Sequence, residues 1–199
     1  MKAVQEGRLD EAVLDEAVER VLNVVFAGEE QHRPEDISDK ETDHKKAADI
    51  ETECAVLLEN NGILPLNTDR KVAYIGEFAE KPRYQGGGSS HINPFRVVSA
   101  LDAAGEKGRS VTYAKGFSNE NDSMTEQELE KSASDCCRAD VAVIFAGLPE
   151  IFESEGYDRT SMKLPKCQNR LIEEVLKVQP NVVVVLHNGS PVELPWQTG

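Results

Sequence analysis

The sequence of 199 residues has no apolar stretch long enough to span a bilayer, which takes about 20 consecutive apolar residues. Its apolar runs have the length of a strand, as at Val182–Leu186. The first residues, MKAVQEGRLDEAV, also lack the apolar core and small-residue cleavage site of a secretory signal. We therefore expect a cytoplasmic protein with no membrane partner.

Basic residues are scarce relative to acidic ones. The chain has 22 Lys and Arg against 36 Asp and Glu, which gives a formal net charge of −14. Such a surface repels the phosphates of nucleic acids and anionic membranes. The charge therefore argues against nucleic acid as a partner and says little about a neutral ligand.

Cysteine and histidine are few and are poorly spaced for metal binding. No CxxC pair occurs, and adjacent cysteines rarely bridge each other; the cysteines are Cys54, Cys136, Cys137 and Cys167. The histidines are scattered as well, at His32, His44, His91 and His187. We expect reduced thiols, no metal and no cofactor.

Two stretches near the N-terminus have helical periodicity. Apolar residues over 9–25 recur at spacings of three and four, which predicts an amphipathic helix, with Asp15 able to cap its second part. A polar linker is predicted over residues 28–43. A second helix is predicted over residues 45–59, ended by Asn60-Asn61-Gly62.

Further along, strand-like runs alternate with helical stretches. Buried strands are predicted from apolar runs at residues 72–76, 111–114, 141–147 and 182–186. Helices are predicted between them at residues 94–104, 125–139 and 168–178, with Thr125 and Glu128 forming a capping box. The alternation predicts an α/β fold, a mostly parallel sheet with helices on both faces and right-handed crossovers.

These patterns divide the chain into two regions, residues 1–43 with the first helix and linker, and residues 44–199 with the α/β domain. The first helix has an apolar face that needs a partner to pack against. No helical pattern follows the strand at residues 182–186 to cover it. We therefore expect a truncated α/β domain, with parts missing at both ends.

Three polar loops follow predicted strands, and ligands bind at the carboxyl ends of strands in parallel sheets. They are a glycine loop at residues 84–91, an acidic loop at residues 150–159 and a short loop at residues 187–190. Glycines let backbone amides approach a phosphate, but the first loop lacks the Lys-Ser/Thr of a P-loop and the spacing of a dinucleotide fingerprint. We favour a close-packed pocket wall there, and for His91 a loop hydrogen bond over a substrate contact.

The acidic loop is the candidate for chemistry. It also carries Tyr157 and one cation, Arg159, and its carboxylates are Glu150, Glu153, Glu155 and Asp158. Clustered carboxylates that are poorly solvated raise one another's pKa, which suits a proton donor at neutral pH. The composition of the loop leaves a solvated acidic surface as the alternative.

Six motifs occur in order along the chain. They are His44-Lys-Lys-Ala-Ala-Asp with Ala55-Val-Leu-Leu-Glu-Asn-Asn-Gly-Ile-Leu-Pro-Leu, Val72-Ala-Tyr-Ile-Gly, Tyr84-Gln-Gly-Gly-Gly-Ser-Ser, Glu153-Ser-Glu-Gly-Tyr-Asp-Arg, Leu164-Pro-x-x-Gln, and Gly189-Ser-Pro-Val-Glu-Leu-Pro-Trp. Their order and spacing resemble the second domain of family 3 glycoside hydrolases of the β-glucosidase type. The helix at residues 9–25 resembles the last helix of that family's preceding barrel domain.

The resemblance implies a retaining β-glycosidase, in which a barrel domain provides an aspartate nucleophile and the α/β domain provides the acid/base. Matched to the family's motif, the acid/base is Glu155. It would protonate the departing oxygen and then deprotonate water. The first step needs a raised pKa, from burial against the substrate and from the charge of the nucleophile.

Glu153 is the alternative acid/base, although in an extended loop its side chain would point to the opposite side from that of Glu155. Asp158 and Arg159 are expected to pair with each other or with loop backbone. The residues expected to bind substrate or shape its pocket are Gln85, Gly87, Ser89, Ser90, His91, Tyr157, Asp158 and Arg159.

The barrel domain and its nucleophile have no counterpart in the sequence. The expected partners are therefore a carbohydrate substrate and the barrel domain, and we expect the chain alone to be inactive. Two other classes of function stay open. One is a non-catalytic α/β module that binds a phosphate or small molecule, and the other is an assembly domain whose exposed apolar faces drive oligomers.

Overall fold

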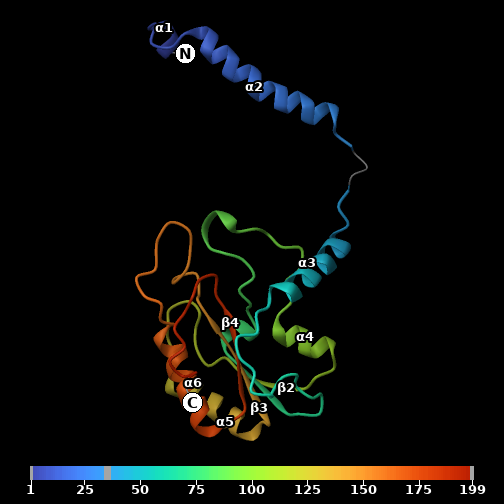
Figure 1. Cartoon of the computed structure of the whole chain (residues 1–199), viewed down its shortest axis with the longest axis vertical. Helices are drawn as coiled ribbons and strands as arrows, with labels where there is room; N and C mark the ends of the chain where they lie inside the picture. Colours follow the sequence, from blue (N-terminus) through green and yellow to red (C-terminus); the bar gives the residue numbers. More distant parts are fainter. Residues whose placement is uncertain (1, 34–36, 198–199) are drawn as a thin grey trace. The chain divides into compact units, whose positions relative to one another are not determined.

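The computed structural model describes residues 2–33 and 37–197, so residues 34–36 of the predicted linker lie outside the described part (Figure 1). The chain divides into two compact units, Met1–Glu53 and Cys54–Gly199. The predicted boundary between residues 43 and 44 stays a prediction.

The N-terminal unit contains helices α1 (Lys2–Gln5) and α2 (Glu11–Glu30), and all of α3 (Lys40–Cys54) except its last residue. Helix α2 is capped by Asp10, whose carboxylate accepts a hydrogen bond from the Ala12 amide at 3.0 Å. The prediction of a cap at Asp15 is therefore wrong, because that residue lies inside the helix. Helix α3 begins five residues before its predicted start, because the carboxylate of Asp39 accepts hydrogen bonds from the amides of Glu41 and Thr42. The predicted helix also ends too late, since residues 55–59 are not helical.

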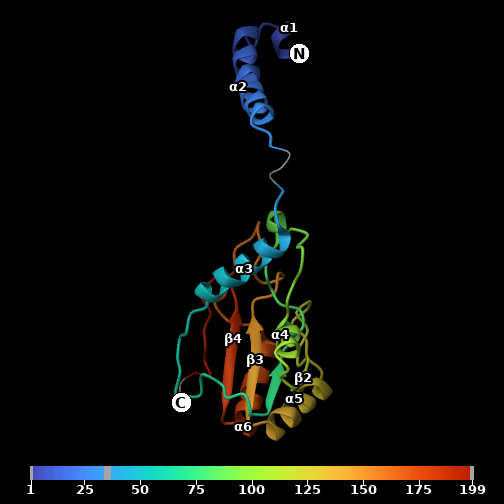
Figure 2. The ribbon, with the colours of Figure 1, turned by 90° about the vertical axis from the view of Figure 1, so that its right-hand side faces the viewer.

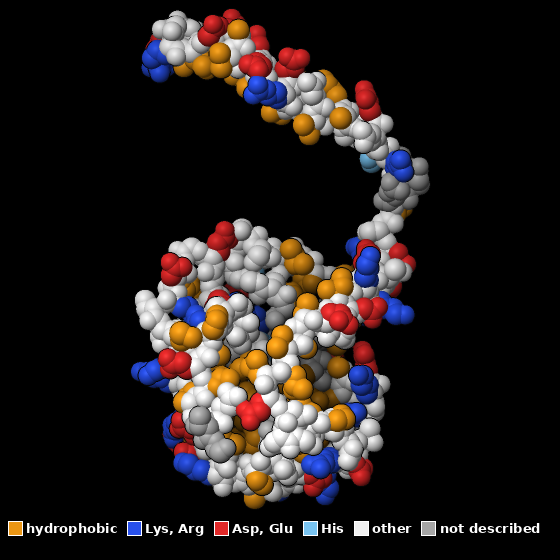
Figure 3. Space-filling view, viewed as in Figure 1, with side chains coloured by type: hydrophobic (Ala, Val, Ile, Leu, Met, Phe, Trp, Pro, Cys, Tyr) orange, Lys and Arg blue, Asp and Glu red, His pale blue; other side chains and the backbone are white. Residues whose placement is uncertain are grey.

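The three N-terminal helices contain no buried residue in the described part of the unit. The apolar side chains of α2 are exposed, and Figure 3 shows them along the helix. The amphipathic character predicted for residues 9–25 is thus present. Among the described residues, no helix combines the length and apolar character needed to cross a membrane.

The second unit is built on a parallel sheet of strands β1 (Val72–Ile75), β2 (Val111–Ala114), β3 (Val141–Gly147) and β4 (Val182–His187). The strand order is β2-β1-β3-β4, and the labelled strands point the same way in Figure 2. All four predicted strands are confirmed to within one residue. The chain moves outward from β1 to β2 on one side and from β3 to β4 on the other, which creates a topological switch point between β1 and β3.

Helices cover both faces of the sheet. Helix α4 (Ala100–Glu106) lies on one face, and helices α5 (Glu126–Arg138) and α6 (Lys166–Val178) contact each other on the opposite face (Figure 1). The fold class predicted from the sequence is confirmed. The prediction of a helix from residue 94 is wrong, because Ser99 and Asp102 form a capping box that starts α4 at residue 100.

The other two helix starts also depend on side-chain caps. The predicted capping box of Thr125 and Glu128 is present at the start of α5. Helix α6 starts two residues earlier than predicted, at Lys166. The carboxylate of Asp122 accepts hydrogen bonds from the amides of Lys166 and Cys167 at 3.1 and 3.0 Å, which satisfies two of the free N–H groups there.

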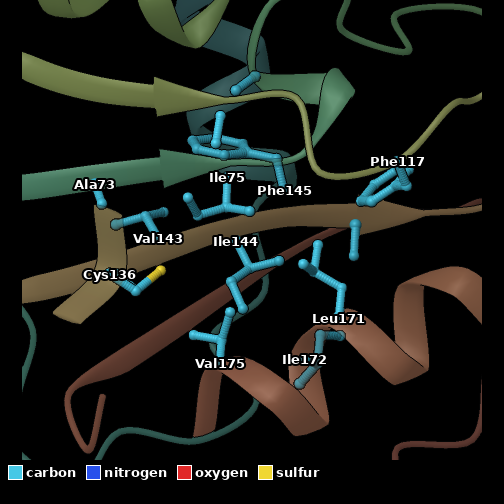
Figure 4. Packing of buried hydrophobic residues seen from close by; sticks show 14 of the residues in the cluster. Ala73, Ile75, Phe117, Cys136, Val143, Ile144, Phe145, Leu171, Ile172 and Val175 are labelled. Atoms are coloured by element: carbon cyan, nitrogen blue, oxygen red, sulfur yellow. The ribbon is translucent and has the colours of Figure 1, made fainter. Parts of the chain in front are cut away.

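The core lies between the sheet and helices α5 and α6 (Figure 4). All seven residues of β3 are buried, because this strand has a neighbour on each side and helices over it. No residue of β4 is fully buried, and Val185 is exposed, so the predicted covering of both faces does not extend to that strand. None of the four cysteines forms a disulfide in the described residues, and Cys136 and Cys167 are buried in this unit.

Candidate functional site at the carboxyl edge of the sheet

The three predicted loops leave the carboxyl ends of β1, β3 and β4, which are neighbours in the sheet. Two glycines allow the strands to approach closely where the loops begin. A Cβ on Gly76 would lie 2.2 Å from the carbonyl oxygen of Phe145, and one on Gly147 would lie 2.1 Å from that of His187. Both have positive φ, at +109° and +145°, so only glycine suits these positions. The sheet thus brings the three loops together at one edge.

Arg83 ties the first loop to the acidic loop. Its Nη1 atom donates to the carboxylate of Glu153 at 2.5 Å and to the carbonyl of Leu148 at 2.6 Å. Its Nη2 atom donates to the carbonyl of Glu153 at 3.1 Å. The side chains of this ion pair are only 14% and 18% exposed, so the pair is poorly screened by solvent.

Glu153 also binds the loop that follows β4. Its Oε2 atom accepts from the amide of Gly189 at 2.9 Å, and its Oε1 atom accepts from the hydroxyl of Ser190. Burial alone would raise the pKa of Glu153. The hydrogen bonds from Ser190, Gly189 and Arg83, with the charge of Arg83, outweigh burial and hold that pKa below its ordinary value. Glu153 is therefore an ionised carboxylate that links all three loops.

Glu155 lies two residues further along and faces the glycine loop. Its side chain is exposed, and its Oε2 atom accepts a hydrogen bond from the amide of Ser89 at 2.7 Å. Hydrogen bonding to Ser89 lowers the pKa of Glu155. The raised pKa that a proton donor requires is thus not present in this structure, because the carboxyl group is exposed and bound to an N–H donor.

The glycine loop packs closely on the acidic loop. A Cβ on Gly87 would lie 2.2 Å from the hydroxyl of Ser154, and one on Gly88 would lie 2.7 Å from Oε2 of Glu155. The loop contains the short 3-10 turn η2 (Gly88–Ser90), and Gly88 has a φ of +77°. The close packing predicted for this loop is present, and its role as a pocket wall stays a prediction. The Ser89 amide, which a phosphate would need, is bonded to the Glu155 carboxylate.

His91 pairs with the third carboxylate of the acidic loop. Its Nε2 atom lies 2.6 Å from a carboxylate oxygen of Glu150, and both side chains are about half exposed. The hydroxyl of Tyr157 donates to the carbonyl of Glu150 at 2.5 Å. The favoured interpretation of His91 as a loop hydrogen-bonding residue fits this contact, which joins two loops.

The remaining predicted site residues make backbone contacts or lie at the surface. Arg159 donates to the carbonyl of Pro191 at 2.6 Å, so it binds loop backbone as predicted. Gln85 accepts from the amide of Ile92 at 3.0 Å, and the Ser90 hydroxyl donates to the carbonyl of Gly87 at 3.2 Å. Asp158 is exposed. The roles predicted for these residues in substrate binding stay predictions.

The predicted clustering of carboxylates is not what the structure shows. Glu150, Glu153 and Glu155 bind three different partners, namely His91, Arg83 and the Ser89 amide. Donors from other loops lower the pKa values of Glu153 and Glu155, so mutual repulsion does not raise the pKa of either group. The physical reason is that the loop folds around donors from other loops, which its local sequence does not reveal.

Two residues beneath the loops were missed in the sequence. Arg83 immediately precedes the glycine-loop motif and lies 70 residues from Glu153 in the sequence, so no local signal connected the two. The ring of His187 stacks on Phe78 at a centroid distance of 5.3 Å, and its Nε2 atom is buried with no hydrogen-bond partner among the described residues. Burial, and then the charge of Arg83, lower the pKa of His187, which is therefore neutral at pH 7.

A hollow of about 700 Å³ lies at the opposite, amino-terminal edge of the sheet, lined by Lys71, Lys107 and Arg109 among others. It is separated from the three loops by the length of the strands. The described residues contain no cluster of three or more His, Cys, Asp and Glu that could hold a metal ion.

Comparison with known proteins identifies the family. The model of the glycosyl hydrolase family 3 C-terminal domain matches residues 55–199. Thermostable beta-glucosidase B of Acetivibrio thermocellus is 46% identical over 200 residues, which are 98% of this chain and 26% of that protein. An exo-alpha-(1->6)-L-arabinopyranosidase of Bifidobacterium longum is 38% identical over 211 residues, covering 98% of this chain and 27% of that protein.

Solved structures agree with these relatives. The crystal structure of a family 3 beta-glucosidase from Bifidobacterium adolescentis matches 98% of this chain and 29% of its own, with a TM-score of 0.87 and 35% identity. Beta-glucosidase 3B from Thermotoga neapolitana, in complex with alpha-D-glucose, matches 98% of this chain and 31% of its own, with a TM-score of 0.74 and 28% identity. The chain spans about a quarter of the length of the curated relatives described above. From its sequence, its sheet and its loops, the chain belongs to glycoside hydrolase family 3, and residues 55–199 correspond to the C-terminal domain of that family.

Proposed function

We propose that this chain provides the general acid/base, Glu155, to a retaining β-glycosidase of the β-glucosidase type. The observation that carries the proposal is the contrast among the carboxylates of the acidic loop. Glu153 is held in an ion pair by Arg83, and Glu150 lies against His91. Glu155 is exposed, faces the glycine loop and accepts its hydrogen bond from a neutral amide. It is the carboxylate best placed to exchange a proton with a sugar bound at this edge.

The proposed reaction divides the work between two domains. A carboxylate from a barrel domain attacks the anomeric carbon, while Glu155 gives its proton to the departing glycosidic oxygen. Glu155 then takes a proton from water, which releases the sugar with retained configuration. The mechanism requires the two carboxyl groups to lie about 5–5.5 Å apart.

The proton-donating step requires a change in the pKa of Glu155. In the chain alone the Ser89 hydrogen bond lowers that pKa, so the carboxyl group is ionised at neutral pH. A neighbouring nucleophile carboxylate and a sugar that excludes water both favour the neutral acid and raise the pKa. The proposal therefore assigns the rise in pKa to assembly of the complete site.

The same argument predicts that the chain alone is inactive. Without a nucleophile no covalent intermediate forms, and general acid catalysis by itself contributes only about 10²–10⁴-fold. The proposed substrate class is a terminal β-linked sugar. The relatives carry different names, beta-glucosidase and arabinopyranosidase. The residues that contact the sugar would therefore determine which sugar is bound.

The proposal can be tested in a chimera in which this chain replaces the matching residues of the Acetivibrio thermocellus enzyme. Glu155→Ala should lower kcat/KM of aryl β-glucosides with poor leaving groups by about 10²–10⁴-fold and spare kcat/KM of those with good leaving groups. The kcat of the activated substrates should still fall, because no base is left to deprotonate water in the second step. Azide should restore turnover of the activated substrates and yield a glycosyl azide of retained configuration.

Glu126→Ala on the exposed surface of α5 is the matched control and should behave as the parent chimera. Azide rescue of Glu153→Ala, with normal behaviour of Glu155→Ala, would assign the acid/base to Glu153 and overturn the proposal. Glycosidase turnover by the purified 199-residue chain would contradict its predicted inactivity.

A further inference from the structure

We propose that Arg83 and Glu153 are positioning residues, whose ion pair holds the segment that carries Glu155 against the glycine loop. The proposal rests on the role proposed for Glu155. It goes further by assigning a function to two residues that would not touch the reacting atoms.

The contacts of Arg83 are concentrated on the segment before Glu155. All three of its hydrogen bonds go there, to the carbonyl of Leu148 and to the carboxylate and carbonyl of Glu153. A planar guanidinium can satisfy these acceptors together because its N–H groups point in fixed directions. Lysine has the same charge but cannot make this fork of hydrogen bonds.

Glu153 extends the link to a third loop. Its two carboxylate oxygens accept from Arg83, from the Gly189 amide and from the Ser190 hydroxyl. Gly189 is close to the carboxylate, since a Cβ there would lie 3.4 Å from either oxygen. Loops that follow β1, β3 and β4 therefore meet on this carboxylate, and none can shift without breaking a charge-assisted hydrogen bond.

Glu155 depends on this anchor because it has few contacts of its own. It makes its hydrogen bond to the Ser89 amide, and residues 155–158 are exposed. Ser154 packs on Gly87 between the anchor and Glu155, and only two residues separate the two carboxylates. Two residues span at most about 7 Å, so fixing Glu153 restricts where Glu155 can lie.

The first test uses the 199-residue chain labelled with ¹⁵N, in which the Ser89 amide reports on Glu155. In the wild-type chain this amide should titrate with a carboxyl group whose pKa is below the ordinary value. In Arg83→Lys the titration should move towards about 4.3, the ordinary value for glutamate, because the hydrogen bond to Ser89 is made less of the time. Arg170→Lys, on the exposed pair with Glu126, is the matched control and should leave the Ser89 titration unchanged.

An unchanged Ser89 titration in folded Arg83→Lys would overturn the proposal, whatever the role of Glu155. Should Arg83→Lys fail to fold, Ser190→Ala removes one hydrogen bond to Glu153 and leaves the ion pair in place. It should move the Ser89 titration in the same direction by a smaller amount. The absence of any movement in Ser190→Ala would then contradict the proposal.

The second test is a double-mutant cycle in the chimera, measured on substrates with poor leaving groups. Arg83→Lys should lower kcat about 10²-fold in the parent, as expected when a catalytic group is displaced by about 1 Å. It should have almost no further effect when Glu155 is already Ala, because no carboxyl group is left to position. Glu153→Gln should behave in the same way.

The outcomes separate this proposal from the role of Glu155. Full additivity of Arg83→Lys and Glu155→Ala, with azide rescue of Glu155→Ala intact, would refute the positioning role and keep the acid/base. Normal turnover and no azide rescue for Glu155→Ala would instead refute the proposed function. The Ser89 titration would still test whether the ion pair of Arg83 and Glu153 holds Glu155 in place.

Discussion

Residues 147–153, which run from the end of β3 into the acidic loop and are called the base here, differ from the tip of the loop, residues 155–158, in how strongly their positions are determined. At the base, Glu153 is mostly buried and accepts hydrogen bonds from Arg83, Gly189 and Ser190. At the tip, Glu155 is exposed and accepts from the Ser89 amide. The same chemical group thus has different surroundings two residues apart. Partners that neutralise a carboxylate favour stability, whereas exposure leaves it able to exchange a proton.

The largest expected effect comes from filling the space at the base. Gly147→Ala would place a Cβ 2.1 Å from a backbone oxygen at a φ of +145°, and should destabilise the chain by more than about 3 kcal/mol or prevent folding. At the tip, Gly156 also has positive φ, +94°, but a Cβ there would meet nothing within 4 Å. Gly156→Ala should therefore cost only about 1–2 kcal/mol. Urea unfolding followed by circular dichroism measures the loss of stability in both variants. Equal losses would contradict the expected difference between the base and the tip.

Removing the buried carboxylate should have the next largest effect. Glu153→Ala leaves the guanidinium of Arg83 without its counter-charge at a site where that side chain is 14% exposed. We expect a loss of about 2–3 kcal/mol in the free energy of unfolding, less than for a fully buried pair because some solvent reaches the site. Glu126→Ala breaks an exposed pair with Arg170 and should cost about 0–1 kcal/mol. A loss from Glu153→Ala no larger than this control would show that Arg83 is well solvated.

Acid should remove the stabilisation that Glu153 provides. The loss in the free energy of unfolding should be no larger than the loss caused by Glu153→Ala. The pKa of Glu153 is lower in the folded chain than in the unfolded one, because hydrogen bonds and Arg83 outweigh burial. Its contribution is therefore fully present above the unfolded pKa, about 4.3, and is lost as the pH falls through the folded pKa.

Urea unfolding of wild type and Glu153→Gln between pH 7 and about pH 3 tests this linkage. Other carboxyls with lowered pKa values, such as those of Glu77 and Asp135, contribute to both proteins, so the difference between the two curves is the relevant quantity. The curves should converge as the pH falls. Curves that stay parallel would mean that Glu153 does not titrate with folding.

The smallest effect on stability is expected at the tip. Glu155→Ala removes an exposed side chain and its bond to Ser89, and should leave the urea midpoint of the chain close to that of the wild type. In the chimera, by contrast, Glu155→Ala should lower the turnover of substrates with poor leaving groups more than the other substitutions at the tip or at Glu153. A strong loss of stability in Glu155→Ala would remove the distinction between base and tip.

The local sequence was sufficient for the strands and for the order of the elements. Four apolar runs with helical stretches between them predicted the parallel sheet, and the chain entered each strand within one residue of the predicted position. The capping box at Thr125 was also readable, since both partners lie within one turn. The equivalent pair of Ser99 and Asp102 was present in the sequence and was missed, which displaced the predicted start of α4.

Contacts between distant residues were beyond the reach of sequence patterns. Asp122 caps α6 from 44 and 45 residues away, and Arg83 reaches Glu153 across 70 residues. Each depends on which strand lies next to which in the sheet. No periodicity or spacing within one segment encodes such a neighbour.

The sequence by itself determined the α/β class, the family resemblance and the three loops, because apolar periodicity and short motifs are local properties of the chain. Only the tertiary structure decided which carboxylate is anchored and which is exposed. The strand order β2-β1-β3-β4 brings Arg83, Glu153 and Ser190 together from three loops, and it leaves Glu155 exposed against the glycine loop. The pKa of a carboxyl group depends on donors and burial within a few ångströms, and those neighbours are assembled only when the sheet forms.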